Sequence, residues 1–345
     1  MKNLQKNLII HLKKIKILYI TLTFLKKKIY QSYNFIIRNR SLIIKNKSTK
    51  YNDNVFVLDT RIVSLLFDSV LLLIRSCNFF YNDEWIIIIY EDKFFRYNEK
   101  HVNKEIYKNN LINIFLQSIL ILPNPPRSIK FIDNREELFQ IIKNSNKIFP
   151  ENYNFLGNNK SYLIDDFNEK DFKNFETNQP IIKTAEFYSK IFENYLKFRN
   201  IKNYITLTIR NKSWARTEWN TDLNDMDLYL NFIKKNKLNN HQILILPDTE
   251  QDVPVEIINF IKDNNLKYNI FYSGSFSIPM RFLAYSKASY NLMSSNGPCT
   301  LLLFMKNNSF LICKDPAQGS NLQEFINKFN KDIFKNRKFV FHKKY

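Results

Sequence analysis

Short apolar strands alternate with amphipathic helices along most of this chain. Residues 55–59 (VFVLD) and 84–90 (EWIIIIY) are short runs rich in β-branched and aromatic side chains. Residues 61–77, which lie between them, repeat their apolar side chains at helical spacing. Runs of the first kind are typical of buried parallel strands, and parallel strands need a crossover between them. The three segments therefore predict a βαβ unit.

The same alternation continues in two series, separated by a polar, Asn-rich stretch from about 146 to 185. The first series goes on with a helix at 110–122, a strand at 128–132 and a helix at 135–145. The second starts with a helix at 184–200 and has strands at 205–209, 241–247, 268–273, 290–295 and 310–314. Its other helices are expected at 225–236, 254–264, 277–288 and 299–306. Two such series predict an α/β protein with two doubly wound, Rossmann-like domains that face a cleft.

Charge and polarity divide the chain further. We expect a basic extension at 1–50, α/β domains at 51–185 and 186–335, and a basic tail at 336–345. The first fifty residues hold eleven Lys and two Arg without any Asp or Glu, and their longest uncharged apolar run, 17–25, has nine residues. A membrane span needs about twenty. The extension is therefore either a basic amphipathic segment on an anionic membrane surface or a leader or helix packed on the body. The expected location is cytoplasmic, with peripheral attachment to the inner membrane face in the first case.

The net charge of +20 does not predict a nucleic-acid partner, because residues 51–345 hold 39 basic and 32 acidic side chains. Recognition motifs for nucleic acids are also missing. Three cysteines and four histidines show none of the spacings of disulfide frameworks or zinc sites. We expect no metal and no cofactor. A nucleic-acid-binding protein stays open as the least favoured alternative.

The four glycines, at 157, 274, 297 and 319, are too far apart for the dinucleotide, Walker A or GxSxG motifs. Asp225 and Asp227 form a DxD, the spacing that some glycosyltransferases use for a divalent metal. The pair also stands at the start of a predicted helix, where carboxylates are favoured by the helix dipole. Helix capping is the preferred interpretation.

Three loops, which follow the predicted strands 205–209, 241–247 and 290–295, carry polar side chains that suit a nucleotide diphosphate. Surface ion pairing and helix capping are the alternatives for the first two loops. In the third, SSNGPCTLLLF, Gly297 permits a tight turn and Pro298 suits a first helical turn, which leaves backbone N–H groups for an anion. The candidate donor-binding residues are Arg210, Arg216, Glu218, Asn220, Asp248, Thr249, Glu250, Ser295, Asn296, Gly297, Pro298 and Thr300.

The segments ILILPDTE and YNIFYSGSFSIPMRFLAYSKASYNLMSSNGPCTLLLF resemble the C-terminal domain of GT-B glycosyltransferases of the heptosyltransferase and fucosyltransferase-like kind. In that family an (N/D)(S/T)GP loop before a helix contacts the nucleotide diphosphate of the sugar donor. Gly297 and Pro298 match it, whereas Ser295 replaces a frequent acid and Thr300 a frequent His. The segments ITLTIRNKSWARTEWNTDLNDM and VFVLDTRIVSLLFDSVLLL resemble further parts of related polysaccharide glycosyltransferases.

The resemblance implies metal-independent sugar transfer from a nucleotide-sugar donor to a polysaccharide, glycolipid or glycoprotein. A carboxylate of the first domain would then deprotonate the acceptor. Asp59, at the end of the first strand, is the first candidate and Asp68 the second. Asp59 could instead cap the next helix, and Asp68 could lie on its polar side. A protein of this fold that binds a nucleotide or sugar without turnover is the main alternative function.

Overall fold

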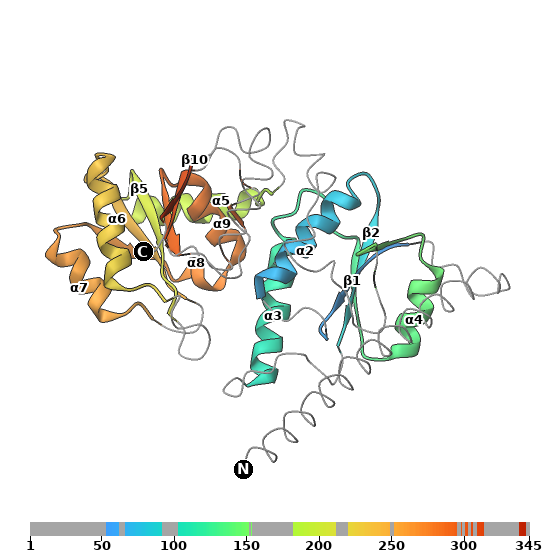
Figure 1. The fold of residues 1–345 in the computed structure, drawn as a ribbon. Coiled ribbons are helices and arrows are strands. Elements are labelled where there is room, and N and C mark those ends of the chain that lie inside the picture. The colour runs from blue at the N-terminus through green and yellow to red at the C-terminus, as the bar shows by residue number, and fades with distance from the viewer. Residues whose placement is uncertain are drawn as a thin grey trace, which may run out of the picture.

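The computed structural model shows two parallel sheets with helices packed on them (Figure 1). The residues that it describes are 53–61, 66–91, 103–151, 153, 182–211, 220–248, 252–294, 298, 301–302, 305, 309–313 and 338–342. The expected basic extension, 1–50, lies outside them.

The first sheet has four parallel strands in the order β3-β2-β1-β4. The strands are β1 (Asn54–Asp59), β2 (Trp85–Tyr90), β3 (Ser128–Ile132) and β4 (Lys147–Phe149). Strands β1 and β2 are almost wholly apolar and buried, which is typical of central strands covered on both faces. The helices are α2 (Leu66–Phe79), α3 (Lys104–Ile119) and α4 (Arg135–Asn144). Figure 1 shows α2 and α3 on one side of the sheet and α4 on the other.

The second sheet has six parallel strands in the order β10-β9-β8-β5-β6-β7. Its strands are β5 (Tyr204–Thr208), β6 (Gln242–Leu246), β7 (Tyr268–Ile270), β8 (Asn291–Ser294), β9 (Ser309–Cys313) and β10 (Lys338–His342). Its helices are α5 (Glu186–Phe198), α6 (Leu223–Lys235), α7 (Val255–Asp263), α8 (Ser273–Phe276) and α9 (Ile278–Lys287).

Alternate residues of β5 and β6 pack on opposite faces of the second sheet. Leu207 and Ile245 belong to an apolar cluster with residues of α6 and α7. Leu244 and Leu246 face the other way and pack in a cluster that includes α9. In Figure 1 α6 and α7 accordingly lie on one side of this sheet and α5, α8 and α9 on the other.

Both sheets have the strand order of a doubly wound nucleotide-binding fold. Numbered from their own first strands, the orders are 3-2-1-4 and 3-2-1-4-5-6, the second being that of the Rossmann fold. The prediction of two doubly wound, Rossmann-like α/β units is therefore confirmed. In such sheets the order reverses beside the first strand, so the switch points lie between β1 and β4 and between β5 and β8.

Helices α3 and α9 join the two units. They pack against each other, and the Gln117 side-chain oxygen of α3 accepts the backbone N–H of Ile278, the first residue of α9, at 3.0 Å. A single apolar cluster extends from the first sheet through α3 to α5, α9 and one face of the second sheet.

The structure differs from the sequence-based expectations at several short elements. Strand β4 lies within the stretch from about 146 that we expected to be a connection, and β10 lies within the expected basic tail. Strand β4 has three residues, too few for a periodic signal, and β10 stands between basic residues that marked this segment as a tail. Each pairs with a strand far away in the sequence. Helix α3 begins at Lys104 and not at 110, because Asn103 caps a polar first turn.

In the part of the chain that the structure describes, no helix is both long and apolar enough to cross a membrane.

Candidate functional site

The first polar cluster lies at the carboxyl end of β1, at the switch point beside β4. Asp59 is the last residue of β1, and Arg61 follows two positions later. Tyr153 comes four residues after the end of β4. Because β1 and β4 are parallel neighbours, these three residues reach the same edge of the sheet.

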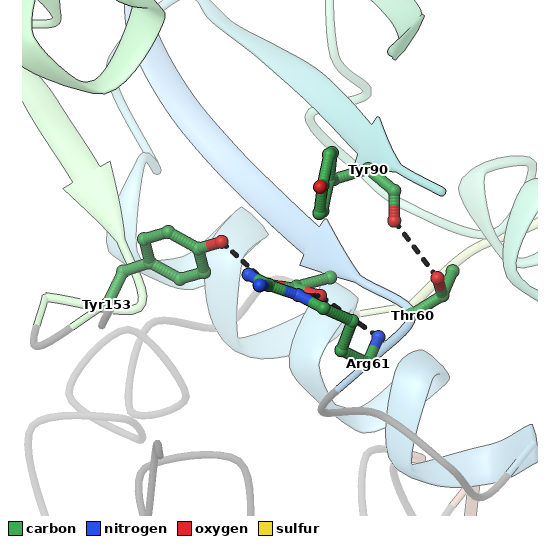
Figure 2. A network of polar contacts seen from close by, with 5 residues as sticks. Thr60, Arg61, Tyr90 and Tyr153 are labelled. Carbon is green, nitrogen blue, oxygen red and sulfur yellow. Dashed lines mark hydrogen bonds and ion pairs between the residues drawn. The ribbon is translucent and has the colours of Figure 1, made fainter. Parts of the chain in front are cut away.

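Asp59 holds Arg61 and Tyr153 in a compact network. Figure 2 labels Arg61 and Tyr153, together with Thr60 and Tyr90. Nη2 of Arg61 lies 2.6 Å from Oδ2 of Asp59, and its Nε lies 3.0 Å from Oδ1. The backbone N–H of Arg61 donates to Oδ1 at 2.9 Å, and the Tyr153 hydroxyl donates to Oδ2 at 2.7 Å. The two-point contact between guanidinium and carboxylate is the strong form of ion pair.

Residues at the end of β2 support this network. The Thr60 hydroxyl donates to the Tyr90 carbonyl at 3.1 Å, and the Arg61 guanidinium carbon lies 5.0 Å from the centre of the Tyr90 ring (Figure 2). Burial lowers the pKa of Arg61, but the hydrogen bond and negative charge of Asp59 outweigh it and raise the pKa above its usual value. The arrangement therefore holds a permanently charged guanidinium at this edge.

Asp59, the expected acceptor base, is fully buried and both of its oxygens accept hydrogen bonds. A general base needs an oxygen within reach of the proton that it removes. The geometry instead suits Asp59 to positioning Arg61 and Tyr153. Asp68, the second candidate, belongs to the first turn of α2.

The second polar cluster lies at the carboxyl ends of β5 and β6. Arg210 follows β5 and exchanges two hydrogen bonds with Thr221, one from its N–H at 3.0 Å and one to its carbonyl at 2.9 Å. The N–H of Asn211 donates to Oδ2 of Asp248 at 3.3 Å, which joins the loop after β5 to the loop after β6. The Asn211 side chain donates to the carbonyl of Asp252 at 3.0 Å. The structure therefore brings Arg210 and Asp248 to one edge, beside the β5/β8 switch point.

Only some of the predicted donor-binding residues belong to the described part of the chain. Asn220 precedes Thr221 in the loop that returns to α6, and Pro298 follows β8 by four residues. The other candidates lie outside the described residues: Arg216, Glu218, Thr249, Glu250, Ser295, Asn296, Gly297 and Thr300.

Asp225, the first residue of the DxD, belongs to a helix cap, as its position at a helix start predicts. Asp222 is the N-cap of α6 and its side chain accepts the N–H of Asp225 at 3.0 Å, while Asp225 accepts the N–H of Asp222 at 2.9 Å. This reciprocal pair is a capping box. Asp225 is buried and Asp227 is exposed, so the two carboxylates do not share a site. Among the described residues, no group of three or more His, Cys, Asp or Glu side chains could hold a metal ion.

Sequence reasoning missed three residues at these edges: Arg61, Tyr153 and Arg281. Arg61 stands two positions from a singled-out aspartate, so its place in the sequence was a usable signal. Tyr153 follows a strand too short to predict. Arg281 lies in α9, whose residues up to Tyr285 are all buried, so the helix shows no polar face that would mark one side chain.

Comparisons with known proteins assign no family to this chain. No protein-family model matches the chain, and no curated protein matches its sequence. Among solved structures, E. coli heptosyltransferase WaaC with ADP-2-deoxy-2-fluoro heptose is 8% identical, with a TM-score of 0.36 over 83% of this chain and 92% of that one. The same enzyme with ADP is 9% identical, with a TM-score of 0.37 over 84% and 93%. Likeness at this level carries no argument about activity, and the fold assignment rests on the strand orders above.

Proposed function

We propose that the protein is a glycosyltransferase that moves a sugar from a nucleotide-sugar donor to a glycan or lipid-linked acceptor. The observation that carries the proposal is the second sheet, whose Rossmann strand order places Arg210, Asn211 and Asp248 together beside its switch point. Ligands of open α/β sheets bind outside the carboxyl ends of the strands at this position. A first sheet of matching strand order supplies a second such edge, as two-domain transferases require.

The chemistry requires positive charge where the donor diphosphate departs. Arg210 lies two residues after the end of β5 and would bind a phosphate through its guanidinium, which suits phosphate geometry better than an ammonium group. The Gly297–Pro298 loop after β8 would add backbone N–H groups at a helix start. Preorganised charges and dipoles of this kind stabilise the leaving group without reorganisation during the reaction.

The first sheet would serve the acceptor. Because Asp59 is committed to Arg61 and Tyr153, Asp68 becomes the first candidate for the base that deprotonates the acceptor hydroxyl. Arg61, fixed by Asp59, would present a permanent charge to a polar acceptor or to the donor phosphates.

The geometry of Asp59 also favours a second candidate function, a nucleotide- or sugar-binding protein without turnover. A chain whose most prominent edge carboxylate is fully paired lacks the most obvious base. The two functions share their ligand and differ only in whether the sugar is transferred.

Binding of nucleoside diphosphates tests both candidates. Titration calorimetry of the full chain with UDP, GDP and ADP should show a dissociation constant of about 1 to 100 μM for at least one of them. Arg210→Ala should weaken that binding at least about tenfold. Arg199→Ala, which removes an exposed arginine at the end of α5, is the matched control. If none of the three nucleotides binds, transfer from a UDP-, GDP- or ADP-sugar and non-catalytic binding of these nucleotides are both contradicted.

Turnover separates the two functions. The test uses the sugar nucleotide whose nucleoside diphosphate binds most tightly. The protein should transfer its sugar slowly to water and faster to an acceptor extract, and each transfer releases the nucleoside diphosphate. Asp68→Asn should remove that release and leave binding intact. Binding without any release of diphosphate would favour the non-catalytic function.

Two sequence-based expectations yield separate proposals. Gly297→Val should weaken donor binding more than it lowers the melting temperature, because a side chain would block the approach of the loop to the diphosphate.

Residues 1–50 should bind anionic membranes. Deleting them should abolish binding to phosphatidylserine-containing vesicles and spare nucleotide binding, whereas unchanged vesicle binding would contradict the membrane role.

A further inference from the structure

A buried arginine lies beside the residues that follow β6 and β7 of the second sheet. Arg281, in α9, is only 3% exposed. Its Nε donates to the Gly274 carbonyl at 2.6 Å, its Nη2 to the Pro247 carbonyl at 3.2 Å and its Nη1 to the Tyr285 hydroxyl at 3.3 Å. All three acceptors are neutral oxygens. Within the described part of the chain, no carboxylate forms an ion pair with this guanidinium.

A guanidinium with neutral neighbours is unusual in a protein interior. Removing an ion from water is unfavourable even after the surroundings relax, and buried charges are normally paired with an opposite charge. The two carbonyl dipoles and the hydroxyl satisfy donors but leave the net charge uncompensated. The site would therefore gain stability when an anion comes close.

Each residue that Arg281 contacts lies at the carboxyl edge of the sheet or is hydrogen-bonded to a residue there. Pro247 follows β6 directly and precedes Asp248. Gly274 belongs to α8, just after β7. The Tyr285 hydroxyl lies 2.9 Å from the hydroxyl oxygen of Thr208, the last residue of β5. The charge therefore lies beside the carboxyl ends of β5, β6 and β7, at the edge that also carries Arg210.

A purely mechanical role would use the same contacts, because the guanidinium ties three loops together. A mechanical tie needs hydrogen-bond donors but no charge. Asp248 is the nearest carboxylate along the chain to these contacts, and it accepts from Asn211 rather than pairing with Arg281. The uncompensated charge is what a mechanical role leaves unexplained.

We propose that Arg281 supplies positive potential for an anionic ligand at this edge, and that the ligand is the diphosphate of a nucleotide. The inference rests on the proposed function and adds to it a buried charge that acts on the ligand without touching it. Coulomb interactions weaken little over such a path, because the protein interior screens charge less than water does. Affinity should then rise with the number of phosphate charges, and Arg281 should account for part of that rise.

The experiment compares ligands of graded charge on the full chain. Calorimetric titrations with UDP, UMP and uridine, and with the adenine and guanine series, establish the best nucleoside for the wild type. Arg281→Gln keeps amide donors and removes the charge. We expect it to weaken diphosphate binding by about tenfold or more, monophosphate binding less, and nucleoside binding by less than about twofold. Arg281→Lys, which keeps the charge, should retain most of the preference for the diphosphate.

A loss of the same factor for all three ligands in Arg281→Gln would overturn the inference, because loop positioning alone would then explain it. Arg199→Gln is the control for removing an arginine charge at an exposed position and should leave the series unchanged. If the wild type binds no nucleoside diphosphate, the proposed function fails, and this inference with it.

A second variant keeps the inference testable if Arg281→Gln does not fold. Tyr285→Phe removes the hydroxyl that links Arg281 to Thr208 but leaves the charge in place. If the charge is what matters, the affinities for the diphosphate, monophosphate and nucleoside should all stay within about threefold of the wild type. A fall of tenfold or more in all three would show that the mechanical link is what binding requires, and would contradict the inference.

Discussion

The Tyr153 hydroxyl donates to Oδ2 of Asp59 at 2.7 Å, although 94 residues separate the two along the chain. This bond fastens the segment after β4 to the end of β1. Tyr153→Phe should lower the free energy of unfolding by about 1.5 to 3 kcal/mol, because a buried carboxylate loses a donor. Urea denaturation measures the change. Tyr81→Phe, at a partly exposed tyrosine, should change it by less than about 0.5 kcal/mol, and equal effects of the two variants would contradict the role of the bond.

The ion pair between Asp59 and Arg61 should be strongly coupled. Arg61→Met leaves a buried carboxylate without its cation, and Asp59→Asn leaves the cation without its carboxylate, so each should cost about 3 to 5 kcal/mol. The double variant should cost clearly less than the two losses together, because it leaves neither charge unpaired. A double-variant cycle by chemical denaturation measures the coupling. Strictly additive losses would show that the pair does not act as a unit.

The cap of α6, formed by Asp222 with Asp225 of the DxD, should contribute to stability, and the DxD should not bind a metal. Asp222→Ala removes the N-cap of α6 and should cost about 0.5 to 2 kcal/mol. Asp227→Ala, at the exposed member of the DxD, should change stability by less than about 0.5 kcal/mol. Thermal unfolding with and without Mn²⁺ provides the measurement. A stabilisation by Mn²⁺ that disappears in Asp227→Ala would contradict the capping interpretation.

Gly274 should not tolerate a side chain. A Cβ at this position would lie 2.8 Å from Cδ1 of Phe271 and 2.9 Å from Cδ2 of Leu246, both of them buried core side chains. Gly274→Ala should therefore cost about 1 to 3 kcal/mol through overpacking, and it should disturb the carbonyl that accepts from Arg281. The melting temperature measures the loss. Ser273→Ala, at the neighbouring exposed position, is the control, and an unchanged melting temperature in Gly274→Ala would show that the core adapts.

Cys77 should contribute an alkaline loss of stability. Burial raises the pKa of its thiol to about 11 from 9.0, partly opposed by a hydrogen bond with the Asn124 backbone. A raised pKa in the folded state means that the contribution is complete below about pH 9 and is lost as the pH rises toward 11. The loss should reach about 2 kcal/mol, and Cys77→Ala should show a flatter pH dependence. Unfolding free energies from pH 8 to 11, in a Cys299→Ser and Cys313→Ser background, measure it. If the unfolding free energies with Cys77 and with Cys77→Ala change with pH in the same way, Cys77 does not cause the alkaline loss.

Elements with a long periodic or apolar signal could be predicted from the sequence. The strand at 128–132 was predicted with the bounds that the structure shows, and α4, α6, α7 and α9 were predicted to within two residues at each end. Strand β4 and helix α8 were not, because three or four residues give no periodicity to read. The start of α3 was missed because its first turn is polar and depends on the Asn103 cap.

The candidate site also contains both predictable and unpredictable residues, depending on whether a clear strand signal positions them. Arg210 and Asp248 could be placed at one edge because both follow strands that the sequence shows clearly, and parallel strands end at a common edge. The partners of Asp59 could not, since Tyr153 depends on the pairing of β4 with β1. Arg281 contacts carbonyl oxygens of residues 7 and 34 positions away, and backbone acceptors leave no trace in the residue types.

The contact between α3 and α9 bears on how the molecule unfolds. One apolar cluster includes Phe56 of the first sheet, Phe115 of α3 and Leu283 of α9, so neither half can melt without exposing core surface of the other. Cooperativity extends as far as such a shared core does. Calorimetry should accordingly record a single transition, and a fragment cut between β4 and α5 should be far less stable than either sheet's own packing would suggest.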